Sequence, residues 1–149
     1  MKSVNVLRAF AFAVILYIAT FILFATVLFA CGVTIGTAPD QIPVFVHVIY
    51  LVLTIPLILM LSKWYFRKFQ PSFSRGVFLG IYTLVVFYVF DIGMLFLGLS
   101  LDEVVSLLYE MIRDWKFYAL TVVVLGTTAY AGFEYDRTYT FGDAGLKKK

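Results

Sequence analysis

The sequence is poor in the residues that build metal and redox sites, with one cysteine and one histidine among 149 residues. Cys31 alone cannot form a disulfide within the chain or a multi-cysteine metal centre. His47 alone excludes haem ligation by two histidines of one chain. The sequence also lacks a glycine-rich phosphate loop, metal-ligand spacing and a recognisable trio of nucleophile, base and acid. We therefore predict a protein that is not an enzyme, with no catalytic residues, no metal and no cofactor.

Charged residues are also scarce, at 14% of the chain, whereas 62% of the chain is hydrophobic. Soluble domains are about a quarter charged and about half apolar. The charges are clumped, so long stretches carry none, and a chain of this length leaves no room for a soluble domain beside the spans. We predict a multi-pass membrane protein. Its net charge of +3 then reflects loops that stay in the cytoplasm, and does not indicate nucleic-acid binding.

Four apolar stretches are long enough to cross a bilayer, which takes about 20 helical residues. The first follows a short basic leader, and residues 9–39 contain no charged side chain. The second opens at Pro43, which suits the first turn of a helix, and Pro56 inside it predicts a kink. We predict an all-α four-helix bundle of antiparallel transmembrane helices at residues 7–31, 43–62, 76–99 and 116–133.

An alternative for the first stretch is a signal peptide, because a basic segment precedes an apolar run. Its end, Leu28-Phe29-Ala30-Cys31-Gly32, resembles a lipoprotein cleavage site. Two features favour a transmembrane helix that is retained. The run is longer than the apolar core of a usual signal peptide, and Phe29 is bulky where a small residue is normal.

The segment between the third and fourth spans has the pattern of an amphipathic helix over residues 101–114. Ser100 and Glu103 have the spacing of a capping box, in which the glutamate side chain reaches back to the N–H of the serine. Apolar and polar residues then occupy opposite sides at helical spacing. The apolar side holds Leu101, Val104, Val105, Leu108, Ile112 and Trp115, and the polar side holds Asp102, Ser106, Glu110, Arg113 and Asp114. We predict a helix on the membrane surface or against the bundle.

The segment after the fourth span, residues 134–149, is polar and ends in three lysines. From Phe133 to Phe141, aromatic residues and one arginine alternate with acids and threonines, and this period of two is typical of an extended segment. A single strand has no partner within this chain. We favour a flexible cytoplasmic tail over a strand added to another protein.

The distribution of lysine and arginine predicts the orientation of the chain. Four spans place both termini on one side, with ten of the twelve basic residues. These ten are Lys2, Arg8, Lys63, Arg67, Lys68, Arg75, Arg137, Lys147, Lys148 and Lys149, whereas the opposite side receives Arg113 and Lys116. Because basic loops remain in the cytoplasm, this positive-inside bias predicts cytoplasmic N- and C-termini, in the inner membrane of a prokaryote.

Small and polar residues on the spans predict which faces meet. At about 100° per residue, Gly76, Gly80 and Gly98 of the third span fall within roughly one quarter of a turn that also holds Asp91. On the fourth span, Thr121, Thr128 and Gly132 lie on one line. We predict that these glycines and threonines are helix-packing residues.

Asp91 is the one charged residue inside the third span, and an acid in hydrocarbon is costly enough to suggest a function. A polar stripe of His47, Tyr50 and Thr54 follows the second span, at a depth from which His47 can approach Asp91. These four residues form a candidate intramembrane polar site for a proton or a cation. The alternative is that Asp91 is neutral, or paired with His47, and fixes helix packing, which the lack of further ionisable groups along a path favours.

Two functions follow from these patterns. The first is a non-enzymatic subunit or accessory factor of a membrane assembly, which contacts membrane lipid and either a protein partner or further copies of itself. The second is a small oligomeric transporter or channel that uses Asp91 as its proton or cation site. A membrane enzyme acting on lipid is a third option, for which the sequence offers no recognisable catalytic set.

Overall fold

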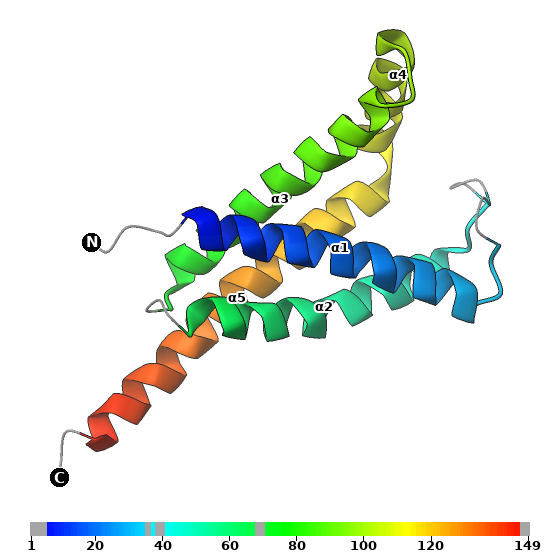
Figure 1. Cartoon of the computed structure of the whole chain (residues 1–149). Helices are drawn as coiled ribbons and strands as arrows, with labels where there is room; N and C mark the ends of the chain where they lie inside the picture. The colour runs from blue at the N-terminus through cyan, green and yellow to red at the C-terminus, as the bar shows by residue number, and fades with distance from the viewer. Residues whose placement is uncertain (1–5, 35–36, 38–40, 68–70, 147–149) are drawn as a thin grey trace.

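The computed structural model of the chain describes residues 6–34, 37, 41–67 and 71–146, with the backbone alone from residue 136. The described residues form five helices and no strand (Figure 1). The helices are α1 (Val6–Ala30), α2 (Val44–Phe66), α3 (Phe73–Phe96), α4 (Leu101–Arg113) and α5 (Trp115–Leu146). Four segments are long and apolar enough to cross a membrane, namely α1, α2, α3 and Trp115–Tyr135 of α5. The all-helical prediction with four spans is confirmed at this level.

The ends of the helices differ from the predicted bounds by a few residues. Pro43 lies directly before α2, so it precedes the first turn that the sequence assigned to it. Helix α3 begins at Phe73 because the hydroxyl of Ser72 accepts a hydrogen bond from the N–H of Arg75 at 3.3 Å, which caps the first turn. Pro56 lies within α2, which continues through it as one helix.

The largest difference from the sequence-based expectation concerns the segment after residue 133. Helix α5 continues to Leu146, so the predicted extended conformation is wrong for residues 134–146. A helix satisfies its backbone hydrogen bonds within the segment, whereas an extended segment needs a neighbouring strand, and the described chain has none. Lys147, Lys148 and Lys149 lie outside the described residues, as do Lys2, Asp40 and Lys68.

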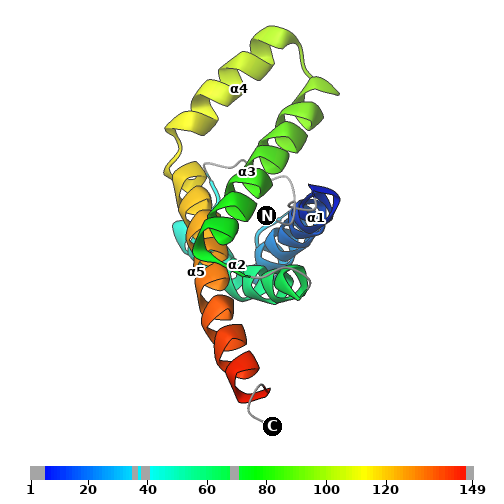
Figure 2. The same ribbon diagram turned by 90° about the vertical axis from the view of Figure 1, so that its left-hand side faces the viewer.

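The four long helices pack in a ring, in the order α1, α2, α5 and α3. Helix α1 contacts α2 and α3, and α5 contacts the same two helices, whereas the diagonal pairs make no such contacts among the described residues. Figures 1 and 2 show α1 beside α2 and α3 beside α5. The apolar core occupies the half of the ring in which α1 and α3 begin and α2 ends. Its fully buried members include Phe12, Leu16, Ile58 and Leu79.

Helices α3 and α5 approach closely where glycines replace larger side chains. A methyl group on Gly76 would collide with the backbone carbonyl oxygen of Thr128, and one on Gly80 would meet the hydroxyl of the same threonine. A methyl group on Gly132 would collide with the carbonyl oxygen of Ser72 and lie 3.0 Å from the backbone of Gly76. Glycine is therefore needed at these three positions for the observed approach of the two backbones.

Gly98 does not share this contact. It lies in the turn after α3, and a methyl group there would meet no atom within 4 Å, so Gly98 makes no close helix contact within the described chain. The sequence-based alignment of Gly98 with Asp91 assumed a helix that continues to residue 99, whereas α3 ends at Phe96. Thr121 joins α5 to α3 through a 2.7 Å hydrogen bond between its hydroxyl and that of Tyr88.

Helix α4 connects the end of α3 to the start of α5 (Figure 2). The N–H and the hydroxyl of Ser100 both donate to the carboxylate of Glu103, at 2.8 and 2.7 Å. These bonds to the charged form hold the pKa of Glu103 below its ordinary value. Val104 is the one buried residue of α4, so most of this helix is exposed in the isolated chain.

Candidate functional site

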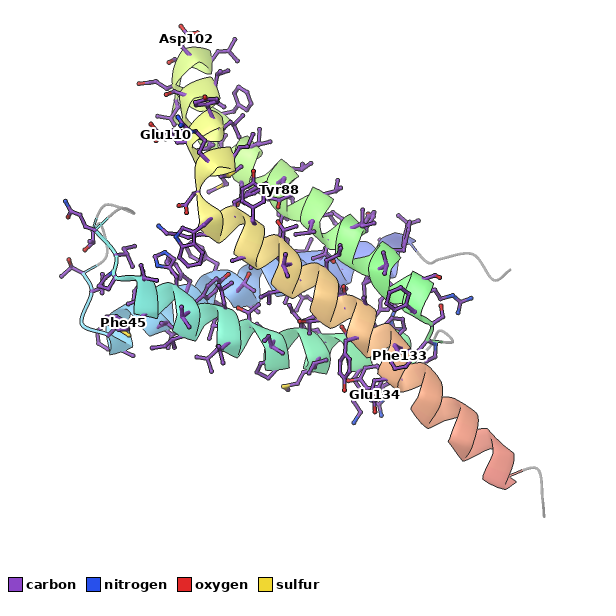
Figure 3. All side chains as sticks on the ribbon, turned by 180° about the vertical axis from the view of Figure 1, so that it is seen from behind. Phe45, Tyr88, Asp102, Glu110, Phe133 and Glu134 are labelled. Carbon is purple, nitrogen blue, oxygen red and sulfur yellow. The ribbon has the colours of Figure 1, made fainter. Side chains whose placement is uncertain are left out.

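A cavity of about 540 Å³ lies in the half of the ring that α4 adjoins, and all five helices contribute to its lining. Helix α1 supplies Tyr17, Thr20, Phe21 and Phe24; α2 supplies His47, Tyr50 and Leu51; α3 supplies Phe87, Tyr88 and Asp91. Leu107, Glu110 and Met111 come from α4, Asp114 from the α4–α5 junction, and Lys116, Phe117 and Leu120 from α5. Figure 3 shows Tyr88 and Glu110 at this end of the molecule and Phe133 and Glu134 toward the other.

Asp91 lines this cavity from α3, and its partner comes from α1. The hydroxyl of Tyr17 donates a 2.7 Å hydrogen bond to Oδ1 of Asp91. The ring of Tyr17 packs edge-on against Phe87 and Phe90, with ring centroids 5.2 and 5.3 Å apart. The aromatic packing orients the hydroxyl toward the carboxylate, so the acid is held by a neutral donor on the neighbouring helix.

His47 lies on the same cavity but makes no hydrogen bond with Asp91. Its Nδ1 is 3.4 Å from the carbonyl oxygen of Pro43, one turn earlier in the chain. Its ring lies near the rings of Phe24 and Trp115, at centroid distances of 5.7 and 6.5 Å. The structure thus places Asp91 and His47 around one cavity. The hydrogen-bond partner of Asp91 is Tyr17, and not His47 as the sequence suggested.

The other two members of the predicted polar site behave differently from each other. Tyr50 lines the cavity, and its ring packs edge-on against Phe24 at a centroid distance of 5.1 Å. Thr54 is fully buried, and its hydroxyl donates to the carbonyl oxygen of Tyr50 at 2.8 Å. This bond stays within α2, and Thr54 is not among the described residues that line the cavity.

The sequence-based site missed the residues that α4 and its junction with α5 contribute. Glu110 and Asp114 are four residues apart, so they share one helical side that faces the cavity. Oδ1 of Asp114 accepts from the N–H of Lys116 at 3.0 Å, and Oδ2 lies 3.3 Å from Nζ of the same lysine. The sequence pattern places both acids on the polar side of the amphipathic helix. It does not show that this side faces the cavity between the long helices.

The lining combines acids with aromatic rings. Among the described lining residues, three carboxylates and one lysine give a formal charge of −2 when His47 is neutral. No group of three or more His, Cys, Asp or Glu residues suited to a metal ion occurs in the part of the chain that the structure describes. The arrangement is chemically suited to a cationic ligand or a proton.

The cavity ends where the apolar core begins. Phe87 belongs to both, and beyond it Leu84 and Leu79 of α3 are buried against residues of the core such as Phe12 and Leu16. These side chains fill the other half of the ring. The cavity is therefore a pocket within one half of the molecule.

No protein-family model matches the chain, and neither the curated proteins nor the solved structures compared with it give a significant match.

Proposed function

We propose that this chain is a non-enzymatic multi-pass membrane protein that acts as a small transporter, with Asp91 as its proton or cation site. One observation carries the proposal, which is that Asp91 lines a cavity to which all five helices contribute. Ionisable residues inside a membrane commonly mark such sites because only a protein interior or a polar cavity compensates for their cost. A packing acid would need no cavity beside it.

The proposed topology is four antiparallel spans with both termini in the cytoplasm of a prokaryotic cell. Contacts between α1 and α2 support the antiparallel arrangement, since Arg8 near the start of α1 lies over Trp64 near the end of α2, while Phe24 packs against His47. The positive-inside bias supports the orientation. Helix α4 then lies at the non-cytoplasmic interface with its apolar face against the membrane or the bundle. The cavity lies in the outer half of the membrane.

A carrier fits the geometry better than an open channel. A channel needs a continuous polar path, whereas the apolar core, which includes Phe12, Leu16 and Leu79, closes the inner half of the ring. A carrier binds its ligand on one side and exposes the site on the other after a rearrangement of the helices. The cavity corresponds to the outward-facing site of such a cycle.

Replacing Asp91 by Asn should abolish proton-coupled cation movement, because the amide can neither carry the charge nor exchange the proton. The measurement is the fluorescence of pyranine in liposomes that hold the purified chain and a pH gradient, after addition of Na⁺, K⁺ or benzyltrimethylammonium. The matched control is Asp102→Asn, which removes an acid from the exposed start of α4, outside the cavity lining.

Three results bear on this proposal. Cation-driven proton movement in the native chain and in D102N, but not in D91N, supports it. Native protein that behaves as empty liposomes do with all three cations contradicts it. D91N protein that is lost during purification, while D102N is obtained normally, would assign Asp91 to helix packing and contradict its transport role.

A second candidate function is that of an accessory subunit of a membrane assembly, and the length of α5 favours it. The part of α5 after the span runs past the ends of α2 and α3 (Figure 1). The hydroxyl of Tyr135 donates to the carbonyl oxygen of Leu59 at 3.1 Å and so ties the end of the span to α2. A projecting helix is a common contact element for a protein partner or a second copy of the chain.

Truncation after Tyr135 should then release the partner without unfolding the bundle. Co-purification of the full and truncated chains in mild detergent, followed by identification of bound proteins and lipids, measures this. A full chain that always runs alone or as a homodimer argues against the accessory role.

A further inference from the structure

The charge of the cavity is concentrated on two of its three acids. Asp114 is paired with Lys116, at 3.3 Å. Asp91 and Glu110 make no ion pair with any residue that the structure describes. They reach the cavity from different helices, α3 and α4. A positive group inside the cavity is therefore attracted by two carboxylates that have no ion pair, while Lys116, the one lysine among the described lining residues, is paired with Asp114.

Aromatic rings form much of the remaining wall, together with a few aliphatic side chains. The ring of Tyr88 stacks with that of Phe117 at a centroid distance of 5.0 Å, and Phe24 packs edge-on against Tyr50 at 5.1 Å. These rings come from all four long helices. Aromatic faces attract cations, and the attraction increases when the cation is removed from water. The same rings also bind apolar groups, so the cavity suits a ligand that is both charged and hydrophobic.

The size of the cavity separates organic from inorganic cations. A volume of about 540 Å³ lies within the range of roughly 300–1,000 Å³ that is typical of sites for drug-sized ligands. A bare metal ion prefers several oxygen ligands in one shell. No cluster of three metal-binding side chains is present in the described chain. A bare metal ion is also too small to contact the several aromatic rings of the cavity at once.

We propose that the cavity binds a lipophilic organic monocation, with its positive group between Asp91 and Glu110 and its apolar body against the aromatic rings. This inference rests on the proposed function, since it names the class of ligand for the same site. Leu107, Glu110 and Met111 are spaced to share one side of α4, and this side completes the cavity. Helix α4 is therefore part of the binding site and contributes one of its two acids that make no ion pair within the described chain.

Matched ions of opposite charge test the proposal. Tetraphenylphosphonium and tetraphenylborate have nearly the same size and shape, so their difference in affinity for the purified full chain reports the charge of the site. Isothermal titration in dodecyl maltoside should show saturable binding of tetraphenylphosphonium, one per chain. Tetraphenylborate should bind at least about tenfold more weakly, which corresponds to about 1.4 kcal/mol.

Two variants and one control locate the site. Asp91→Asn and Glu110→Gln should each weaken tetraphenylphosphonium binding by about tenfold. The double variant should bind the two ions with similar affinity. Asp102→Asn removes an acid from the same helix as Glu110 but outside the cavity, and it should leave both affinities unchanged. Glu110 lines the cavity but is exposed to solvent rather than packed in the core, so E110Q tests the site even where D91N fails to fold.

The outcomes separate this inference from the proposed function. Equal affinity of the native chain for both ions, or binding that neither variant weakens, overturns the inference, because the ions then partition into a neutral pocket or the detergent. Proton movement driven by Na⁺ or K⁺ without tetraphenylphosphonium binding overturns the inference and keeps the transporter. Tetraphenylphosphonium binding that needs both acids, without any proton movement, supports the cation site and contradicts transport.

Discussion

Replacing Gly76 by Ala is expected to lower the free energy of unfolding by about 1–3 kcal/mol, the usual cost of adding a methyl group to a closely packed contact. The added carbon would overlap the backbone carbonyl oxygen of Thr128 and lie 3.0 Å from Cα of Ala129. A backbone atom cannot rotate away, so α3 and α5 must separate. Because hydrophobic attraction between helices is absent in lipid, close packing is a main source of their association. Losing this packing therefore lowers the stability of the bundle directly.

The expected effect of alanine at Gly80 is smaller than that at Gly76. There the added methyl group would meet the hydroxyl of Thr128, which is a side-chain atom that turns about one bond, and Cα of Leu125 at 3.2 Å. The hydroxyl now donates to the carbonyl oxygens of Val124 at 2.8 Å and Leu125 at 3.2 Å, so its movement weakens these hydrogen bonds but requires no shift of the backbone.

Gly93→Ala is the matched control on the same helix. A methyl group at Gly93 would meet no atom within 4 Å. Alanine has the higher helix propensity, by about 1 kcal/mol, so G93A should be neutral or slightly stabilising. Unfolding by sodium dodecyl sulfate in mixed dodecyl maltoside micelles, followed by circular dichroism, measures all three variants. Equal stability of G76A and G93A would show that α3 and α5 do not make this close contact.

A reporter fused to the C-terminus is expected to give an all-or-none result. With ten basic residues on the side of the termini and two on the other, the proposed orientation keeps the C-terminus in the cytoplasm. Green fluorescent protein at that end should therefore fluoresce. Alkaline phosphatase, which is active only outside the cytoplasm, should give background activity at the same position.

A second phosphatase fusion, placed after Ser100, supplies the control. It retains α1, α2 and α3, so an odd number of spans should carry the enzyme outside, where it becomes active. Activity at the C-terminus together with inactivity after Ser100 would reverse the orientation, and would move the cavity and α4 to the cytoplasmic side. Activity at both positions would contradict the proposed even number of spans.

The helices themselves follow largely from local sequence. Uninterrupted apolar stretches locate α1, α2, α3 and the first part of α5, because a bilayer-length run of such residues is stable as a helix whatever its neighbours are. The capping contact of Ser100 with Glu103 was also visible, since it joins residues three apart. The segment after residue 133 was missed because its alternation of aromatic and polar residues has the period of a strand, whereas its backbone continues the helix begun at Trp115.

The candidate site was predictable only in part. Periodicity placed Asp91 on the side of α3 that carries Gly76 and Gly80, and in the structure Asp91 lines a cavity while the two glycines contact α5. Its hydrogen-bond partner proved to be Tyr17 of α1, 74 residues away in the chain, and this pairing depends on the packing of α1 against α3.

Residue types and spacing by themselves determined that this chain has four helices long and apolar enough to cross a membrane, with Asp91 inside the third. The reason is that hydropathy and helical period are properties of each segment alone. Tertiary structure decided that α1 and α5 are diagonal, that Glu110 and Asp114 join Asp91 around one cavity, and that Thr54 does not. These facts depend on which faces meet, and close approach at Gly76, Gly80 and Gly132 selects one arrangement among several that the same apolar faces allow.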